Sequence, residues 1–351
     1  MVRTALILLL LAGTASAQQP VRQALRGDSV AIYNLAGDLR VEGGSGADVT
    51  VDITLRGADA DQLRAESGPI RGRETLRVIY PGDAVHYPAL GRDSRSELRV
   101  RDDGTFWTGG DGRRGREVTI SGRSGDVEGW ADLIVRVPRG KSVAVYLAVG
   151  EVTVSNVDGE LMVDVSSADI TSEHTRGTLS LDTGSGNVTI ADAEGDITLD
   201  TGSGDIQAAN VRGASLNIDT GSGDVDVTDV TVGELSIDTG SGDVTARGVS
   251  SKNVIIDTGS GSIELTLRAD VEQVELDSGS GSVTLGVPEG LGAELEIDTG
   301  SGEIEFAFPV QARLLENDHF EGLLGDGRGR ITIDTSSGDV RVIRSQPTAN
   351  R

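Results

Sequence analysis

The sequence has 351 residues, a net charge of −25 and no cysteine. This charge argues against nucleic acid as a partner, because phosphates would be repelled, and the lack of cysteine excludes stabilisation by disulfides. Glycine is abundant at 49 residues and aromatic residues make up only 3%, which favours a β protein with an aliphatic core.

Residues 1–17 are predicted to be a secretory signal peptide. Arg3 precedes the apolar run Ala5–Ala12, and Ala15-Ser16-Ala17 has the small residues of a cleavage site before Gln18. The apolar run is too short to span a bilayer, and no later segment is apolar enough for a transmembrane helix. We therefore expect an exported chain that resides in the periplasm, on the cell surface or outside the cell.

Residues 18–80 are expected to form irregular coils that cap the N-terminal end of a longer array. Apolar and polar residues alternate there with the period of two that indicates strands, and Leu35–Leu39 is a faint copy of the repeat turn described below. A cap is expected because the open end of a stack of strands would pair with other chains. The alternating stretches are Ser29–Tyr33, Asp38–Glu42, Asp48–Leu55 and Thr75–Tyr80.

Residues 81–117 interrupt this alternation with a polar insertion rich in glycine, aspartate and arginine. One interpretation is a binding loop for an acidic or aromatic ligand. The interpretation we favour is a solvated insertion whose arginines balance the acidic body of the protein, since charge runs are usually solvated. The arginines surround Phe106 and Trp107, and they are Arg92, Arg95, Arg99, Arg101, Arg113, Arg114 and Arg116.

Residues 118–344 are organised around the repeated motif Asp-Thr-Gly-Ser-Gly. It begins at Asp182, Asp200, Asp219, Asp238, Asp257 and Asp298. Asp277 begins a near copy and Asp334 a looser one, and successive aspartates up to Asp298 lie 18 to 21 residues apart. A fixed short period of this kind is typical of stacked repeats.

The residues around each motif alternate between apolar and polar, so each repeat is predicted to be strand, turn, strand, turn. A single hairpin cannot bury its apolar face, whereas stacked copies form one continuous core. The sequence thus predicts an all-β parallel β-solenoid, or β-helix, with coils of 18–21 residues and a right-handed sense. We expect regular coils at 177–306, an insertion at 308–330, a terminal coil at 331–344 and a disordered tail at 345–351.

The chemistry of the motif suggests how its turn is made. Glycine accepts a positive φ without a Cβ clash, so Gly-Ser-Gly is expected to reverse the chain tightly. The preceding aspartate is expected to accept hydrogen bonds from the amides of the turn.

From the turn Pro138-Arg139-Gly140 onward, the chain resembles the bacterial putative-adhesin families of β-strand-repeat proteins. The resemblance rests on Val135-Arg136-Val137-Pro138, on the repeated Ser-Gly-Asp-Val turns and on the closing segment Ile331–Val342, while Gln18–Glu117 matches only loosely. These families are domains of unknown function with parallel β-helix-like folds, related to autotransporter adhesin heads. The resemblance implies an exported, non-enzymatic surface or periplasmic protein, without catalytic residues to transfer.

Asp-Thr-Gly-Ser also occurs in aspartic proteases, whose chemistry needs two carboxylates that face each other and share a proton. Parallel stacking instead predicts a single row of carboxylates, which argues against a protease.

Calcium binding is a second alternative, because glycine–aspartate repeats resemble the nonapeptide calcium β-roll. This chain has only one such turn per 18–21 residues, and a calcium site needs six to eight oxygen ligands. The cofactor prediction is therefore none, with calcium as the alternative. The metal candidates are Asp200, Asp205, Asp219, Asp224, Asp238 and Asp243.

A polysaccharide-active β-helix enzyme is the third alternative. The only histidines, His86, His174 and His319, are far apart in the chain, and no pair of carboxylates stands out for acid–base chemistry. The sequence therefore favours a non-enzymatic adhesin, or a surface or periplasmic structural module. Its expected partner is a surface polymer or an envelope protein.

Overall fold

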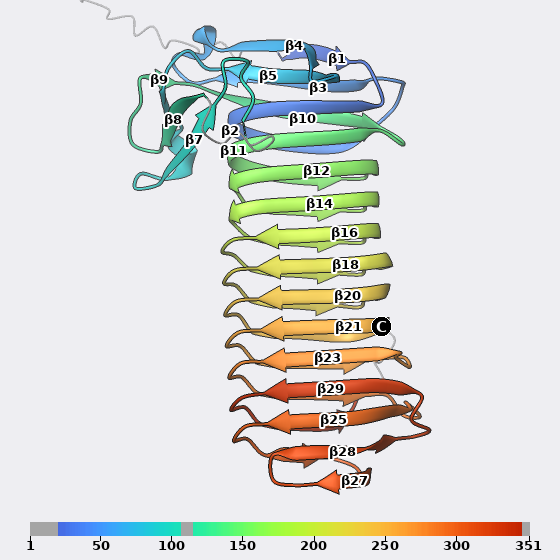
Figure 1. Cartoon of the computed structure of the whole chain (residues 1–351). Coiled ribbons are helices and arrows are strands. Elements are labelled where there is room, and N and C mark those ends of the chain that lie inside the picture. The colour runs from blue at the N-terminus through green and yellow to red at the C-terminus, as the bar shows by residue number, and fades with distance from the viewer. Residues whose placement is uncertain (1–19, 107–114, 346–351) are drawn as a thin grey trace, which may run out of the picture.

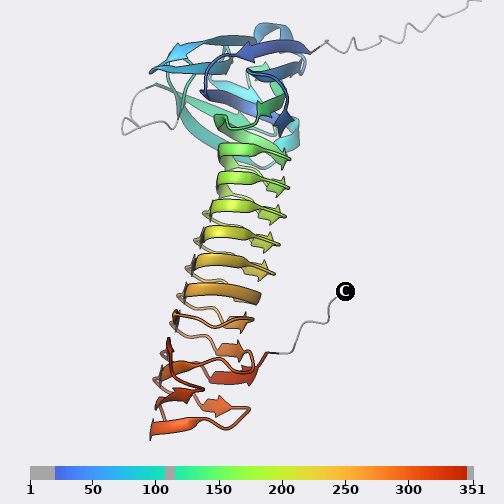
Figure 2. The same cartoon turned by 90° about the vertical axis from the view of Figure 1, so that its right-hand side faces the viewer.

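The computed structural model describes residues 20–106 and 115–345, and it shows a long stack of β-coils with a broader head at its N-terminal end (Figure 1). Seen from the side, the stack is a narrow column that extends away from the head (Figure 2). The predicted all-β solenoid is confirmed. The predicted signal peptide, Trp107, Arg113, Arg114 and most of the predicted tail lie outside the described residues.

Each regular coil contributes one long and one short strand, and each strand pairs in parallel with its equivalent in the next coil. The long strands are β12 (Asp158–Ser167), β14 (Arg176–Ser185), β16 (Glu194–Thr201), β18 (Arg212–Thr220), β20 (Thr231–Thr239) and β23 (Gln273–Ser278). The short strands are β13 (Ile170–Glu173), β15 (Val188–Ala191), β17 (Ile206–Ala209), β19 (Val225–Thr228), β22 (Ile263–Leu267) and β24 (Val283–Val287).

Three strands continue around a corner and so belong to both faces: β2 (Ser29–Gly44), β11 (Ser142–Ser155) and β21 (Val244–Thr258). Strand β2 is a complete coil that lies in register on β11, with Gly37 beside Gly150 and Asp38 beside Glu151. The faint repeat turn predicted at Leu35–Leu39 is therefore confirmed as part of a stacked coil.

The core consists of the apolar residues that alternate along every strand. Leu181, Leu199, Ile237 and Ile256 are all fully or almost fully buried and belong to one column of register neighbours. Burying each such side chain stabilises the fold by about 1.5–3 kcal/mol. The polar residues between them face outward, as the period of two predicts.

Glycines are needed at the motif turn because successive coils approach each other closely. A Cβ on Gly240 would lie 2.5 Å from the carbonyl oxygen of Gly221, and one on Gly242 would lie 1.8 Å from that of Gly223. Neither glycine has a left-handed φ, so the expectation that the motif requires positive φ is wrong for these turns. Residues with a left-handed φ lie in the other turn of the coils instead, and they are Asn156, His174, Asp192, Asn210 and Asp229.

A buried threonine bridges neighbouring coils at the motif corner. The hydroxyl of Thr258 donates a hydrogen bond to the carbonyl of Gly242 in the preceding coil (2.9 Å) and accepts one from the N–H of Gly261 in its own turn (3.0 Å). Thr239 makes the same pair of bonds. The motif threonine thus satisfies two backbone groups that would otherwise be buried without partners.

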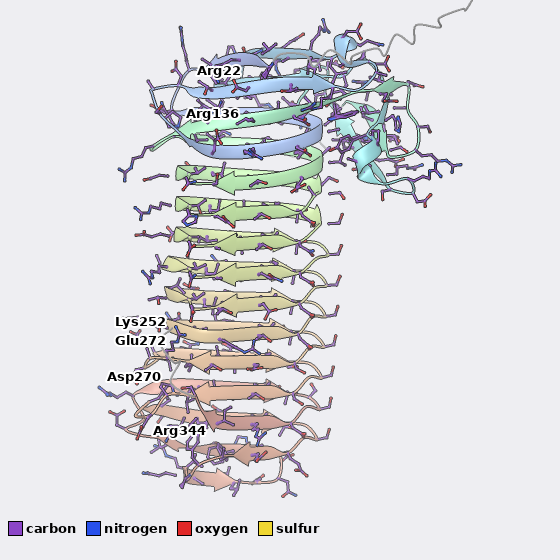
Figure 3. The ribbon with its side chains drawn as sticks, turned by 180° about the vertical axis from the view of Figure 1, so that it is seen from behind. Arg22, Arg136, Lys252, Asp270, Glu272 and Arg344 are labelled. Carbon is purple, nitrogen blue, oxygen red and sulfur yellow. The ribbon has the colours of Figure 1, made fainter. Side chains whose placement is uncertain are left out.

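The head adds strands that run both parallel and antiparallel to the stack. Strand β3 pairs antiparallel with β1 and β10, β10 and β5 pair in parallel with β2, and β4 pairs antiparallel with β5. Asp52 on β3 bonds to Arg22 (2.6 Å) and Arg136 (2.5 Å), which are labelled in Figure 3. These elements are β1 (Val21–Leu25), β3 (Val49–Arg56), η1 (Ala60–Gln62), β4 (Arg64–Ile70), β5 (Arg73–Ile79) and β10 (Trp130–Pro138).

The described part of the segment 81–117 holds β6, a short helical turn, β7 and the first residues of β8, and these strands join β9 in a separate four-stranded sheet, ordered β7-β8-β6-β9. Several of its arginines pair within the same segment, such as Arg99 with Glu117 (3.4 Å) and Arg116 with Asp83. Phe106 is buried and packs edge-on against Tyr33 of β2 (5.3 Å between ring centroids). These elements are β6 (Ala84–His86), η2 (Pro88–Leu90), β7 (Arg95–Val100), β8 (Arg116–Ser121) and β9 (Val127–Glu128).

The distal end of the stack departs from sequence order. The coil made by β29 and β30 lies between the coil of β23 and β24 and the coil of β25 and β26 (Figure 1). The strands of this coil therefore do not pair with the coil one repeat away in the sequence. A hairpin of β27 and β28 then pairs antiparallel with β25. These strands are β25 (Ala293–Thr299), β26 (Ile304–Phe306), β27 (Gln311–Leu315), β28 (His319–Leu324), β29 (Gly329–Thr335) and β30 (Val340–Arg344).

No helix among the described residues is long and apolar enough to cross a membrane.

Candidate functional site

The first aspartates of the motifs form one continuous row, which we call the aspartate ladder. Each member lies beside the next across a parallel strand pair, so successive residues are about 4.8 Å apart. This confirms the predicted single row and places no two motif carboxylates opposite each other across a cleft. In spatial order the ladder is Asp164, Asp182, Asp200, Asp219, Asp238, Asp257, Asp277, Asp334 and Asp298.

Different side chains continue the ladder at its two ends. Tyr146 is the register neighbour of Asp164, and its ring stacks on Tyr33 at 4.5 Å. At the distal end, Nδ1 of His319 lies 2.6 Å from Oδ1 of Asp298. Aromatic rings therefore bound the row on the head side and a cationic group bounds it on the other.

Partial burial and like charge raise the pKa of several ladder carboxyls. The pKa of Asp164 is raised to about 6, mainly by burial and then by Asp182. The pKa values of Asp182, Asp219, Asp257 and Asp277 are also raised, again by burial first and by neighbouring carboxylates second. Keeping these carboxylates ionised side by side therefore lowers the stability of the fold at neutral pH.

A second row follows the motif turn and has a backbone-capping role, so we call it the capping column. Oδ1 of Asp205 accepts a hydrogen bond from the N–H of Asp224 (3.0 Å), and Oδ1 of Asp224 accepts one from the N–H of Asp243 (2.9 Å). The expectation that the motif aspartate binds the turn amides is therefore wrong in detail. The residue five positions later makes these bonds, and the column includes Asp169, Asn187, Asp205, Asp224 and Asp243.

The six metal candidates are divided between these two rows. Three belong to the aspartate ladder, and three belong to the capping column with one carboxylate oxygen already used in a hydrogen bond. Across the described residues, no three histidine or acidic side chains gather closely enough to hold a metal ion. The ladder members are Asp200, Asp219 and Asp238, and the capping members are Asp205, Asp224 and Asp243.

The capping column continues into the head, where the surface is hollowed into what we call the junction groove. One cavity of about 310 Å³ and a second of about 280 Å³ are both lined by Asp38 and Glu151. The first is also lined by Arg40, Asp132 and Thr153, and the second by Tyr87, Leu90, Ser167, Asp169 and Ser185. The groove therefore lies where the head, the small sheet and the first coils meet.

Two elements that are distant in sequence create this groove. Asp38 and Glu151 occupy equivalent positions of stacked strands β2 and β11, whereas Tyr87 precedes η2 in the inserted segment. Ser96 of β7 contacts Ser166 of the first regular coil (3.2 Å between hydroxyl oxygens), which fixes the small sheet against the stack. The groove wall is thus made by docking of the inserted segment.

The electrostatics of the groove centre on Asp38. Burial raises the pKa of its carboxyl, and Asp132 raises it further, while a hydrogen bond from Tyr87 acts in the opposite direction. Oδ1 of Asp132 accepts the backbone N–H of Asp38 (3.2 Å), and Arg56 pairs with the other oxygen of Asp132. Burial also raises the pKa of Tyr87, so its hydroxyl remains a hydrogen-bond donor at neutral pH.

The groove offers carboxylate and hydroxyl acceptors beside small apolar surfaces. Tyr87 packs edge-on against Trp130 at 5.6 Å between centroids, which holds its ring in place. Such a surface suits a ligand that is rich in hydroxyl or ammonium donors. Asp38 lies within the faint repeat turn predicted at Leu35–Leu39, but the groove has no signature in the sequence, because nothing distinguishes Tyr87 within the polar insertion.

The three histidines do not converge. His86 is on β6 and bonds to Glu128 (3.3 Å), His174 is in a turn near Asp192 (3.5 Å), and His319 is on β28 at the distal end. They therefore form no common site in this fold.

Comparison with known proteins gives a family match and two solved structures that align with most of the chain. The profile of the Toastrack DUF4097 family matches residues 131–343, the part of the chain on which the adhesin-type resemblance rests. No curated protein matches the sequence significantly. The chain is also similar to the solved structure of a putative cell adhesion protein from Clostridium sporogenes, with 9% identity and a TM-score of 0.19. That alignment covers 93% of this chain and 100% of the other. A putative adhesin from Bacteroides fragilis has 11% identity and a TM-score of 0.29, covering 93% of this chain and 98% of the other.

Proposed function

Because the chain belongs to the Toastrack DUF4097 family, a family of unknown function, we propose that it is an exported, non-enzymatic adhesive module. Its stack acts as a rigid spacer, and its junction groove binds a hydroxyl-rich polymer that carries ammonium groups, such as an amino-sugar polysaccharide of a cell surface. The single observation that carries this proposal is the junction groove at the head of an uninterrupted parallel stack.

The chemistry of the groove supports a polymer of this kind. Asp38 and Glu151 supply negative charge, Ser167 and Ser185 supply hydroxyls, and Leu90 supplies an apolar contact. Carboxylates accept hydrogen bonds from sugar hydroxyls and attract ammonium groups. A nucleic acid would be repelled by the same carboxylates.

The distribution of charge supports the distinction between head and stack. Residues 18–138 carry 17 basic and 19 acidic side chains, whereas residues 139–351 carry 13 basic and 37 acidic ones. The stack therefore keeps the protein soluble and repels other acidic surfaces. The head is nearly neutral, which allows close approach of a polymer to the groove.

Binding is tested with oligosaccharides of glucosamine, and with cello-oligosaccharides as a neutral comparison, by calorimetry in moderate salt. We expect the glucosamine oligomers to bind and the Glu151→Gln and Tyr87→Phe variants to bind at least ~5-fold more weakly, the loss of one charged or buried hydrogen bond. Asp226→Asn is the matched control, because Asp226 is an exposed acid on β19, far along the stack. Equal weakening by Asp226→Asn would assign binding to net charge and would exclude the groove.

Export is tested separately by expressing the full chain and identifying the N-terminus of the protein outside the cytoplasm. We expect the mature chain to begin at Gln18, after Ala15-Ser16-Ala17. An intact Met1 on protein that remains in the cytoplasm would contradict export and would leave the binding result unaffected.

A further inference from the structure

The coil that comes last in sequence occupies an internal place in the stack. We call residues 329–344 the closing coil, and the space it fills between β23–β24 and β25–β26 the distal slot. Asp277 of β23 and Asp298 of β25 are both register neighbours of Asp334 in the closing coil. Figure 1 shows β29 between β23 and β25. The chain therefore passes over one coil position between residues 287 and 293 and returns to fill it later.

Both edges of the distal slot are hydrogen-bonded to the closing coil. On one side the N–H of Arg330 donates to the carbonyl of Glu272 (3.1 Å), and on the other the N–H of Gly329 donates to that of Gly292 (2.9 Å). The threonine bridge also runs both ways, from Thr335 to the Gly281 carbonyl (3.0 Å) and from Thr299 to the Gly338 carbonyl (3.3 Å). Without the closing coil, two strand edges would face each other unpaired and would recruit another strand.

The charges on the far wall of the slot are complementary to this one coil. Arg330 lies 3.3 Å from Glu294, and Arg341 lies 3.3 Å from Glu305, both on the far wall of the slot. Other coils place neutral or acidic residues at the position of Arg330, namely Glu160, Thr178, Asp196, Ser215, Glu234, Asn253 and Gln273. At the position of Arg341 they place Thr171, Thr189, Gln207, Asp226, Thr245, Glu264 and Thr284. Any of these coils in the slot would lose both ion pairs.

We propose that the distal slot is an exchange site, in which the closing coil of one copy of this chain fills the slot of a second copy and so links the two copies into a coil-swapped dimer. The closing coil of a second copy carries the same Arg330, Thr335 and Arg341, so it makes the same contacts in the slot. The swapped and unswapped forms differ only in the link between β28 and β29 and in the entropy of association, so protein concentration decides between them.

The connection between the hairpin and the closing coil favours exchange. Residues 325–328 join β28 to β29 in a tight turn, with φ values of 54° at Gly325 and 70° at Gly327. Glycine adopts many backbone conformations without a Cβ clash, so this link can also extend toward a second copy. The closing coil pairs with residues 57 positions earlier (Asp277 with Asp334), whereas regular coils pair over 18 or 19 positions. Closure over the longer loop comes late in folding, which leaves the slot open to a second copy.

Single cysteines report the exchange directly, because the chain has no cysteine of its own. Glu296 and Thr332 are register neighbours across the wall of the slot. Full-length Glu296→Cys and Thr332→Cys variants are mixed, unfolded, refolded at rising protein concentration and oxidised. In a swapped dimer the two cysteines, on different chains, lie side by side. We expect disulfide-linked mixed dimers whose yield rises with concentration, identified by mass spectrometry of the peptide that joins positions 296 and 332.

The matched control is the pair Ser236→Cys and Ile255→Cys. These residues are register neighbours in the same outward column but in successive coils of the regular stack, where no slot is skipped. We expect at least ~10-fold less mixed dimer from this pair, and an equal yield from the two pairs would overturn the proposal. The double variant Glu296→Cys/Thr332→Cys, refolded at high dilution, must give an internally bridged monomer. If it does so while the mixed single variants give no linked dimer at any concentration, the closing coil fills its own slot only and exchange is excluded.

Discussion

Nδ1 of His319 lies 2.6 Å from Oδ1 of Asp298, the last carboxylate of the aspartate ladder. Asp298 and then Glu321 raise the pKa of this imidazole by hydrogen bonding to its charged form. The ladder thus ends on a titratable cation, while its other end lies against the stacked rings of Tyr146 and Tyr33. This arrangement connects the stability of the whole stack to pH.

We predict that the protein is more stable at pH 5 than at pH 8. Ladder carboxyls with a raised pKa bind protons more tightly in the folded state, which stabilises the fold at low pH. For Asp164 this stabilisation is lost as the pH rises from about 3.8 to about 6. The raised pKa of His319 acts in the same direction, because its stabilising charge is lost as the pH rises through the folded value. Thermal melting at constant ionic strength, followed by circular dichroism, measures this trend.

One variant and the stability of the protein in acid test the cause of this pH dependence. Asp164→Asn should raise stability at pH 8 by about 1 kcal/mol, after allowance for solvent screening of a half-buried group, and should flatten the profile near pH 6. Asp52 has a lowered pKa, mainly because of its bond to Arg22, so stability should fall again below about pH 3.8 as such pairs are protonated. A melting temperature that rises steadily from pH 5 to pH 8 would contradict the role given to the ladder.

The threonine bridge predicts a large effect from a nearly isosteric change. Thr258→Val keeps the volume but removes the hydroxyl that joins Gly242 and Gly261. Leaving two backbone groups without partners should cost about 1–3 kcal/mol, measured by urea unfolding. Thr245→Val, on the outward face of the same strand, is the control and should change stability by less than about 0.5 kcal/mol. Similar losses for both variants would exclude the bridge as the cause.

Gly240→Val should destabilise the protein by about 2–3 kcal/mol or more, because its Cβ would meet the carbonyl oxygen of Gly221 at 2.5 Å. Ser236→Thr changes an outward residue of the same coil and should have little effect. Equal melting temperatures for the two variants would show that the coils can separate at this corner. If Gly240→Ala lowers the stability nearly as much as Gly240→Val does, the Cβ atom itself causes the clash.

Calcium should give no stabilisation beyond that of an equal ionic strength of another divalent salt. The six candidate aspartates are split between two rows, and three of them already cap backbone amides. Melting in calcium, in magnesium and in chelator measures the difference, since a ligand that binds only the folded state raises the melting temperature. A calcium-specific rise of several degrees would restore the calcium alternative and would point to an oxygen cage between the rows.

The repeating coil could be predicted from the sequence alone. The alternation around Leu199 and Ile218 assigns inward and outward faces because side chains on a strand point to opposite sides, and the 18–21-residue period fixes the coil length. It also predicted that the motif aspartates stand in one row. These features follow from local spacing, which any parallel stack of such repeats must obey.

The order of the coils and the position of the groove depend on contacts between segments that are distant in the sequence. Repeats such as those at Asp277, Asp298 and Asp334 present almost the same edge, so their sequences do not state which lies beside which. The order is seen only in the pairing of β29 with both β23 and β25. The need for Gly240 arises from contact between coils, which φ preferences do not report. The junction groove likewise exists because the segment that holds Tyr87 docks against β2 and β11 from far along the chain, and such docking has no periodic signature in the sequence.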